Sequence, residues 1–337
     1  MTGAGTISVA MATYNGARWL RAQLDSFAAQ TRLPDELVVT DDGSTDGTPD
    51  VVAAFAATAP FPVRFVRNPV RLGFNGNFAH AIGLTTGDIV FISDQDDAWY
   101  PDKVERVAAL MDETPGCLCV VNDQAIADAE GRETGGTVLG NVRALGRPDT
   151  WYGPGCCTAF SRALMPVLAP MPGDVVAYDH WINTLADAMG TRRVLDVPLQ
   201  MYRRHGGNAS GSVFAAERPG WRHLARAARR GGAARAIGAK VAEVDALIAR
   251  LETSEAVAAL AARGATERGA AERGSTERGG IEAGLAALRA ERDDYAARSA
   301  VLDRRRLPRA GAVVRLLMRG GYRRFSGPVT ALKDLLS

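Results

Sequence analysis

The sequence predicts an α/β fold with a mostly parallel sheet flanked by helices, followed by a helical C-terminal extension. Short apolar strands alternate with helices over the first 111 residues, and this alternation is typical of parallel sheets with right-handed crossovers. After about residue 213 the composition shifts to Ala, Arg, Gly and Glu. We therefore expect an α/β domain over 1–213, a helical or linker segment over 214–300 and a basic helical region over 301–337.

The spacing of apolar residues sets the first elements. Ile7, Val9 and Met11 alternate with other residues and predict a strand that ends between Thr13 and Asn15. The next apolar residues recur at helical spacing and predict a helix: Trp19, Leu20, Leu24, Phe27 and Ala28. A second strand over 36–40 then leads into the polar loop "DDGSTDG".

The alternation continues along the chain. "PVRFVRN" (62–68) and "DIVFIS" (88–93) predict strands, and "GFNGNFAHAIGLTTGD" (73–88) and "PDKVERVAALM" (101–111) predict helices. Farther on, "CLCVVND" (117–123) predicts a strand, and "TWYGPGCCTAFSRALM" (150–165) predicts a Gly-rich turn followed by a helix. "AYDHWINTLADAMG" (177–190) predicts a helix, and "RRVLDVPLQMYRRHGGNASG" (192–211) a short strand pair with a basic loop.

The charge of the chain is unevenly distributed. The net charge is +2, yet the tail from Leu302 to Ser337 holds nine Lys or Arg residues against two Asp residues. A basic tail on an acidic body favours an anionic surface as partner, and no nucleic acid is expected. The N-terminus predicts no signal peptide and no run is long enough to span a membrane. We expect a cytoplasmic protein, with peripheral attachment to the inner face of the plasma membrane as an alternative.

Two further patterns predict no chemistry. The four cysteines (Cys117, Cys119, Cys156 and Cys157) lack zinc-ligand spacing, so we expect them to be reduced and buried. The repeat "GATERGAAERGSTERG" (264–279) has a five-residue period. Because such a period gives a helix no constant apolar face, the repeat predicts a solvated, marginal helix or a linker.

Three carboxylates crowd together directly after the strand at 88–93. Asp94, Asp96 and Asp97 fall within four residues, and like charges this close repel and raise one another's pKa. Mg²⁺ or Mn²⁺ would offset that repulsion, because hard cations prefer oxygen ligands and are often shared with substrate phosphates. The plainer interpretation is an acidic helix N-terminus ahead of Pro101. The loop follows a buried strand and faces "DDGSTDG" across the carboxyl edge of the sheet, which favours a metal–diphosphate site.

The motifs, taken in order, resemble glycosyltransferase family 2, which has the GT-A fold. The resemblance covers about residues 7–211 and rests on "ISVAMATYNGARWLRAQLDSFAAQT", "LVVTDDGSTDGT", "GDIVFISDQDDAWYPDKVE" and "AYDHW". Within the family, "SDQDDAWYPDK" and "YRRHGGNASG" most resemble bacterial rhamnosyltransferase-like members that build surface polysaccharide.

The resemblance implies roles for residues that bind a nucleotide-sugar donor. Thr13 and Tyr14 would contact the base, and Asp42 would accept a hydrogen bond from a pyrimidine ring N–H. Asp94 and Asp96 correspond to the DxD motif. Asp96 is the expected metal ligand, whereas Asp94 binds either the metal or the ribose.

Further roles follow on the side of the diphosphate and the acceptor. Asp97 would orient the donor, and Arg203, Arg204 and His205 would close on the diphosphate. Asp179 in "YDHW" matches the catalytic base, although Tyr178 stands where many members have a second acid. The implied reaction is inverting transfer of a sugar from a dTDP- or UDP-sugar, with dTDP-rhamnose a candidate, to a glycan or lipid-linked acceptor.

Each of these residues also has a structural interpretation. Tyr14 fits a core aromatic, Asp42 a loop cap and Asp179 a helix N-cap. Arg203 and Arg204 fit a solvated charge pair.

Other functions are weighed against the transferase. A non-catalytic sugar-nucleotide-binding scaffold would explain the single carboxylate in "YDHW". A nucleotidyltransferase would need a Gly-rich loop with Arg or Lys after the first strand, which "ATYNGARW" does not supply. The sequence lacks the GxxxxGK[ST] motif of a P-loop kinase.

The tail predicts a basic amphipathic helix. Arg315, Arg319 and Arg323 recur four apart on one ridge, and the other side is apolar: Val313, Val314, Leu317, Met318, Tyr322 and Phe325. Such a helix lies flat in a membrane interface, or it packs on the α/β domain with its Arg side chains solvated.

Overall fold

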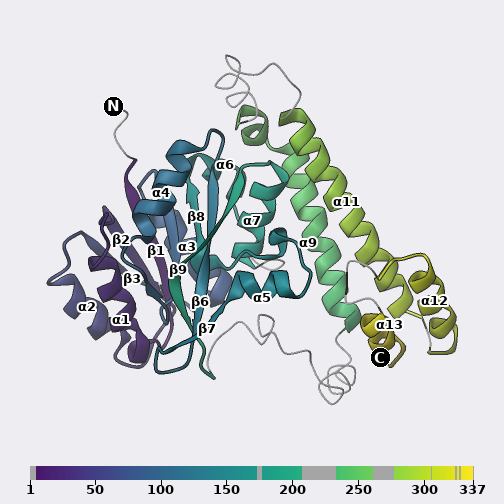
Figure 1. The fold of residues 1–337 in the computed structure, drawn as a ribbon, viewed down its shortest axis with the longest axis horizontal. Coiled ribbons are helices and arrows are strands. Elements are labelled where there is room, and N and C mark those ends of the chain that lie inside the picture. Colours follow the sequence, from purple (N-terminus) through teal and green to yellow (C-terminus); the bar gives the residue numbers. More distant parts are fainter. Residues whose placement is uncertain are drawn as a thin grey trace. The chain divides into compact units, whose positions relative to one another are not determined.

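The computed structural model describes residues 5–172, 177–206, 233–260, 277–304, 306–322, 325 and 328–336. They fall into two compact units, of which the first comprises 1–216 with 259–273 and the second 217–258 with 274–337. The first unit contains the sheet and the second is helical (Figure 1). The expected boundaries after residues 213 and 300 stay predictions, and the five-residue repeat lies, up to residue 276, outside the described residues.

A nine-stranded sheet forms the first unit, with the order β3-β2-β1-β4-β8-β6-β9-β5 and with β7 paired to β6. Strands β1, β2, β3 and β4 pair in parallel, and so do β6 and β9, whereas β5, β7 and β8 run antiparallel to their neighbours. The predicted mostly parallel α/β fold is therefore confirmed. The strands are β1 (Ile7–Thr13), β2 (Glu36–Asp41), β3 (Val63–Arg67), β4 (Ile89–Ser93), β5 (Ala98–Trp99), β6 (Cys119–Ala127), β7 (Glu133–Thr137), β8 (Thr158–Ser161) and β9 (Arg192–Arg203).

Helices cover the sheet and complete its core (Figure 1). Helix α1 buries Leu20, Leu24 and Phe27 at helical spacing, and burying each side chain contributes about 1.5–3 kcal/mol. The four cysteines are buried and free, as expected. The helices of this unit are α1 (Ala17–Ala28), α2 (Thr48–Ala56), α3 (Gly73–Leu84), α4 (Lys103–Glu113), α5 (Val138–Ala144), α6 (Met165–Leu168) and α7 (Tyr178–Ala188), with short 3₁₀ turns η1 (Asp149–Trp151), η2 (Gly155–Cys157) and η3 (Arg162–Leu164).

Two element predictions are wrong. The strand pair expected over 192–211 is one long strand, β9, because a register shift beside Asp123 accommodates Pro198, which has no N–H to donate. The helix expected directly after the Gly-rich turn is preceded by β8, which lies between β4 and β6. Four residues, Thr158 to Ser161, are too few to show a strand period in the sequence.

The second unit is built from helices α9 (Ala233–Thr253), α11 (Glu277–Leu302), α12 (Arg306–Met318) and α13 (Pro328–Leu336). Helices α9 and α11 pack side by side (Figure 1). The apolar side expected for the tail helix is divided: Val313 and Tyr322 are buried, whereas Val314, Leu317 and Met318 are exposed. Within the described part of the chain, every helix is too short or too polar to cross a membrane.

Candidate active site

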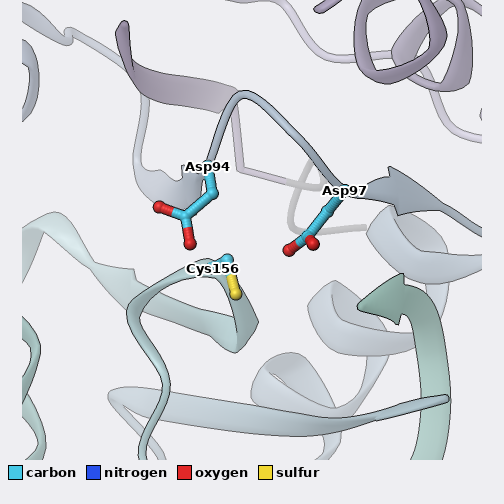
Figure 2. Close-up of side chains that lie close together, drawn as sticks. All are labelled: Asp94, Asp97 and Cys156. Atoms are coloured by element: carbon cyan, nitrogen blue, oxygen red, sulfur yellow. The ribbon is translucent and has the colours of Figure 1, made fainter. Parts of the chain in front are cut away.

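The carboxyl ends of β1, β2, β4 and β9 bring the predicted site residues to one edge of the sheet. Residues 94–97, here called the acidic loop, join β4 to β5. Figure 2 shows the carboxylates of Asp94 and Asp97 reaching from the two ends of this loop toward the turn that carries Cys156. One ligand atom of each of these three side chains lies within 4.8 Å of the others. The acidic loop is thus crowded in space as well as in sequence.

The carboxylates of the acidic loop have raised pKa values. Burial, followed by the charges of Asp96, Asp97 and Asp179, raises the pKa of Asp94 well above its ordinary value. Burial and the Asp96 charge raise the pKa of Asp97 to about 7. Burial also raises the pKa of Asp96, although His205 and Arg203 oppose this shift. A cation placed among these carboxylates would favour their ionised forms.

The segment after β9 faces the acidic loop. The His205 Nε2 atom lies 2.9 Å from Asp96 Oδ2, and the imidazole stacks on the Trp19 indole with ring centroids 5.3 Å apart. The buried Arg203 side chain donates from Nε to the backbone oxygen of Asp96 (3.2 Å). Arg204 is exposed and donates its backbone amide to Ala127. The structure therefore brings Arg203 and His205 to the acidic loop, whereas the Arg204 side chain is on the surface.

The predicted base lies near the same loop. Asp179 is in the first turn of α7, whose N-cap is Ala177, so Asp179 is not the N-cap itself. Burial raises the pKa of Asp179, and the backbone amides of His180 and Gly155 partly offset this. Its charge is close enough to raise the pKa of Asp94.

The predicted base-binding residues differ in exposure. The Tyr14 ring is 39% exposed. Thr13 is buried, and its hydroxyl donates to Asp41 Oδ1 (3.0 Å). Asp42 is buried and accepts from the amides of Leu72 (2.6 Å) and Gly73 (2.9 Å). Contact of Thr13 and Asp42 with a nucleotide stays a prediction, because here both side chains bind neighbouring parts of the fold.

Sequence reasoning missed two residues at this end of the site. Gln95 donates to Tyr14 O (3.1 Å) and accepts from Tyr14 N (3.0 Å), which ties the end of β1 to the acidic loop. Gly16 leaves room for this contact, since a Cβ there would lie 2.1 Å from Gln95 Oε1. The guanidinium of Arg71 lies 4.1 Å from the centroid of the Tyr14 ring. Gln95 is the middle residue of Asp94-Gln95-Asp96, where the resemblance predicts no particular side chain, and no sequence pattern marks Arg71.

The acidic loop and His205 fit a divalent cation. Asp96 and His205 offer an oxygen and an imidazole nitrogen, and both side chains remain about 15% exposed. Mn²⁺ accepts both ligand types, and Mg²⁺ favours the carboxylate. Asp94 and Asp97 could add oxygens, but Cys156 is a soft ligand that neither ion prefers. The donor set therefore supports a metal at Asp96 and His205 with Asp94 nearby.

Two solved structures share the fold. The structure of S. aureus TarS 1–349 in complex with UDP-GlcNAc has a TM-score of 0.56 and 15% identity, covering 98% of this chain and 90% of that chain. A mannosyltransferase from Pyrobaculum calidifontis, in complex with GDP-Man and Mn²⁺, has a TM-score of 0.50 and 22% identity, covering 99% and 85%. The architecture is thus the GT-A fold of glycosyltransferases.

The sequence comparisons identify the family. The family model for glycosyl transferase family 2 matches residues 8–165. An uncharacterized glycosyltransferase of Nostoc sp. is 31% identical over 226 residues, 62% of this chain and 68% of that protein. The dTDP-rhamnosyl transferase RfbG of Shigella flexneri is 26% identical over 219 residues, 60% of this chain and 74% of that protein. The chain belongs to glycosyl transferase family 2, as the resemblance predicted.

Proposed function

We propose that the chain is an inverting, metal-dependent glycosyltransferase that moves one sugar from a nucleotide-diphosphate donor to an acceptor hydroxyl. The observation that carries the proposal is that His205 and Asp179 lie close to the acidic loop, in which the pKa values of Asp94 and Asp96 are raised. A cation bound to a diphosphate would complement the charge of such a loop.

Each residue has a role in a single displacement. Asp179 accepts the proton of the acceptor hydroxyl, whose oxygen bonds to the anomeric carbon on the face opposite the diphosphate. The bond from that carbon to the diphosphate oxygen breaks, and the leaving group keeps the electron pair. Asp96 and His205 would hold Mg²⁺ or Mn²⁺, which would supply charge stabilisation for the leaving diphosphate. Arg203 supports the acidic loop at Asp96, because its Nε atom donates to the backbone oxygen of that residue.

The donor is proposed to be a dTDP- or UDP-sugar, with dTDP-rhamnose the first candidate. Support comes from the name of the Shigella relative and from Tyr14, an exposed aromatic residue beside Arg71 that could pack on a base. The Mn²⁺ in the Pyrobaculum structure supports use of a divalent cation. The acceptor is proposed to be a glycan or a lipid-linked sugar in bacterial surface polysaccharide synthesis.

The proposal is tested by incubating the protein with dTDP-rhamnose, UDP-glucose, UDP-GlcNAc and GDP-mannose, each with Mn²⁺, Mg²⁺ or EDTA. Release of nucleoside diphosphate from one donor, lost in EDTA, is the expected result. The competing function is a non-catalytic sugar-nucleotide-binding scaffold. Binding of a nucleotide sugar without any release, over hours and at high protein concentration, would establish the scaffold instead.

Peripheral attachment to anionic membranes is a second part of the proposal. Val314, Leu317 and Met318 form an exposed apolar ridge on α12, and Arg315 and Arg319 lie exposed beside it. Apolar insertion and about 1 kcal/mol per basic residue would combine in binding. Met318→Glu should release the protein from phosphatidylglycerol vesicles at low salt without changing donor turnover. Equal sedimentation of the variant and the wild type would remove this ridge from the proposal.

A further inference from the structure

A buried ammonium group lies close to the acidic loop. Lys103, in the first turn of α4, is 1% exposed. Its Nζ atom donates to the backbone oxygen of Cys156 (2.9 Å) and to Gln200 Oε1, and lies 4.1 Å from the centroid of the Trp99 ring. Burial lowers the pKa of Lys103 to about 8, although Asp97 and Asp94 oppose this. Burying a charge costs several kcal/mol unless other groups compensate, so this lysine calls for an explanation beyond packing.

Gln200 connects this ammonium group to Asp97. Its Nε2 atom donates to Asp97 Oδ2 (3.0 Å) and to Gln124 Oε1 (3.2 Å). Lysine can only donate, so the amide oxygen of Gln200 must face Lys103 and its NH₂ group must face Asp97. The chain Lys103–Gln200–Asp97 therefore has one possible direction, and every side chain in it is buried.

Asp97 passes the connection on to the end of β9. Its Oδ1 atom accepts from the backbone amide of Arg203 (3.3 Å). The pairing of β5 with β9 places Trp99 opposite Gln200. The acidic loop directly precedes β5 and the end of β9 follows Gln200, so both segments are anchored to the same pair of strands. Beyond this point His205 reaches Asp96, 109 residues away in the sequence. The two proposed metal ligands thus come from segments that the buried chain holds together.

We propose that Lys103 and Gln200 are positioning residues, which through Asp97 fix the end of β9 against the acidic loop and so set His205 opposite Asp96 for a divalent cation. This inference rests on the proposed metal-dependent function. It gives a role to the lysine of "SDQDDAWYPDK" that the reaction itself leaves without one. It also explains why a carboxylate stands at position 97. Asp97 is only 1% exposed, so little of its side chain can reach the nucleotide-sugar donor.

The sharpest test is Gln200→Glu. Glutamate keeps an oxygen for Lys103 but has no N–H for Asp97, so it breaks the chain at one link and adds a repelling charge. Mn²⁺ affinity is measured from the EPR signal of free Mn²⁺, with dTDP or UDP present. We expect Gln200→Glu to bind Mn²⁺ at least about 10-fold more weakly, since residues that orient metal ligands typically contribute 10–100-fold.

A matched control is Gln30→Glu. Gln30 is also buried, accepts from Val104 N (3.0 Å) and donates to Tyr100 O (2.8 Å), so it braces the same helix without contacting Asp97. Wild-type Mn²⁺ affinity in folded Gln30→Glu, beside the loss in Gln200→Glu, supports the inference. Wild-type affinity in Gln200→Glu, or an equal loss in both variants, overturns it.

Folding is checked by thermal melting. If Gln200→Glu does not fold, Lys103→Met replaces it, because an apolar side chain of similar length often substitutes for a buried charge without loss of stability. Unchanged Mn²⁺ affinity in folded Lys103→Met overturns the inference, and a loss supports it. A wild-type protein that binds no Mn²⁺ with either nucleotide rejects the proposed metal-dependent function instead, and the two failures are thus distinguishable.

Discussion

Two Asp-Asp pairs lie at the same edge of the sheet, each following a parallel strand, and they differ in how many other carboxylates surround them. Asp41 and Asp42 end β2, and amides and hydroxyls of the fold surround them: Gly43, Ser44 and Thr13 donate to Asp41, and Asn68, Leu72 and Gly73 donate to Asp42. Asp96 and Asp97 follow β4, and their neighbours include two further carboxylates, those of Asp94 and Asp179.

The difference separates carboxylates surrounded by hydrogen-bond donors alone from carboxylates that also lie close to other carboxylates. The first pair has its lone pairs occupied by protein donors, so removing a carboxylate there leaves donors unsatisfied. The acidic loop has raised pKa values because burial outweighs the hydrogen bonds that its carboxylates accept, and at Asp94 and Asp97 neighbouring carboxylates add to the shift. Two adjacent acids after a strand can therefore be either hydrogen-bonded parts of the fold or a crowded acidic cluster. The hydrogen-bond donors and carboxylates around them distinguish the two cases.

The largest expected effect comes from the acidic loop. Asp96→Ala removes a proposed metal ligand and should lower donor turnover by about 10³-fold or more, since metal stabilisation of a leaving group is worth several kcal/mol. The melting temperature of the metal-free protein should change little, because burial raises the pKa of Asp96 and so makes its charge costly, which offsets the lost contact with His205. Turnover is measured as nucleoside diphosphate release with saturating Mn²⁺. Wild-type turnover in this variant would show that Asp96 holds no essential cation.

Asp179 tests a carboxylate that belongs to neither pair. Asp179→Asn keeps the shape but removes the basic oxygen, and transfer should fall by about 10²–10⁴-fold with donor affinity unchanged. The wild-type kcat/KM should also fall in acid. Burial raises the pKa of Asp179, so the base becomes protonated, and activity is lost, at a higher pH than for an ordinary aspartate. A pH–rate profile that is flat down to pH 4, or an Asn variant of full activity, would assign the base to another residue.

The sequence predicts which acids lie at the sheet edge, whereas the hydrogen-bond partners of each acid come from the fold. Strand ends are readable because β1 and β4 are mostly apolar and are followed by polar residues, so the sequence places Thr13 at the end of β1 and Asp94 directly after β4. Which of the two cases applies to each Asp pair is not readable, because the partners of Asp42 lie 26 to 31 residues away at Asn68, Leu72 and Gly73.

Long-range contacts also hide residues that support the site. A lysine in the first turn of a helix predicts a solvated side chain, and only the fold shows that Lys103 meets Gln200, 97 residues later. Pro198 likewise predicts a break between two strands, whereas β9 continues through it with extra residues between Leu195 and Pro198, opposite Asn122 and Asp123 of the distant strand β6.

The smallest expected effect falls on the first pair and concerns stability. Asp42→Asn replaces one acceptor oxygen by an NH₂ group that faces the amide of Leu72 or Gly73, so at least one buried donor loses its partner. The free energy of unfolding should fall by about 1–3 kcal/mol, measured by urea denaturation, while Mn²⁺ affinity with dTDP stays within about twofold.

Asp97→Asn is the matched variant in the acidic loop. Relief of crowding there should offset most of the lost hydrogen bonding, so its stability should change less than that of Asp42→Asn. If the two variants lose equal stability, the pairs do not differ in the way their hydrogen bonds indicate. If Asp42→Asn instead weakens dTDP binding without a change in unfolding, Asp42 acts on the nucleotide base and is not a brace for the loop at 68–73.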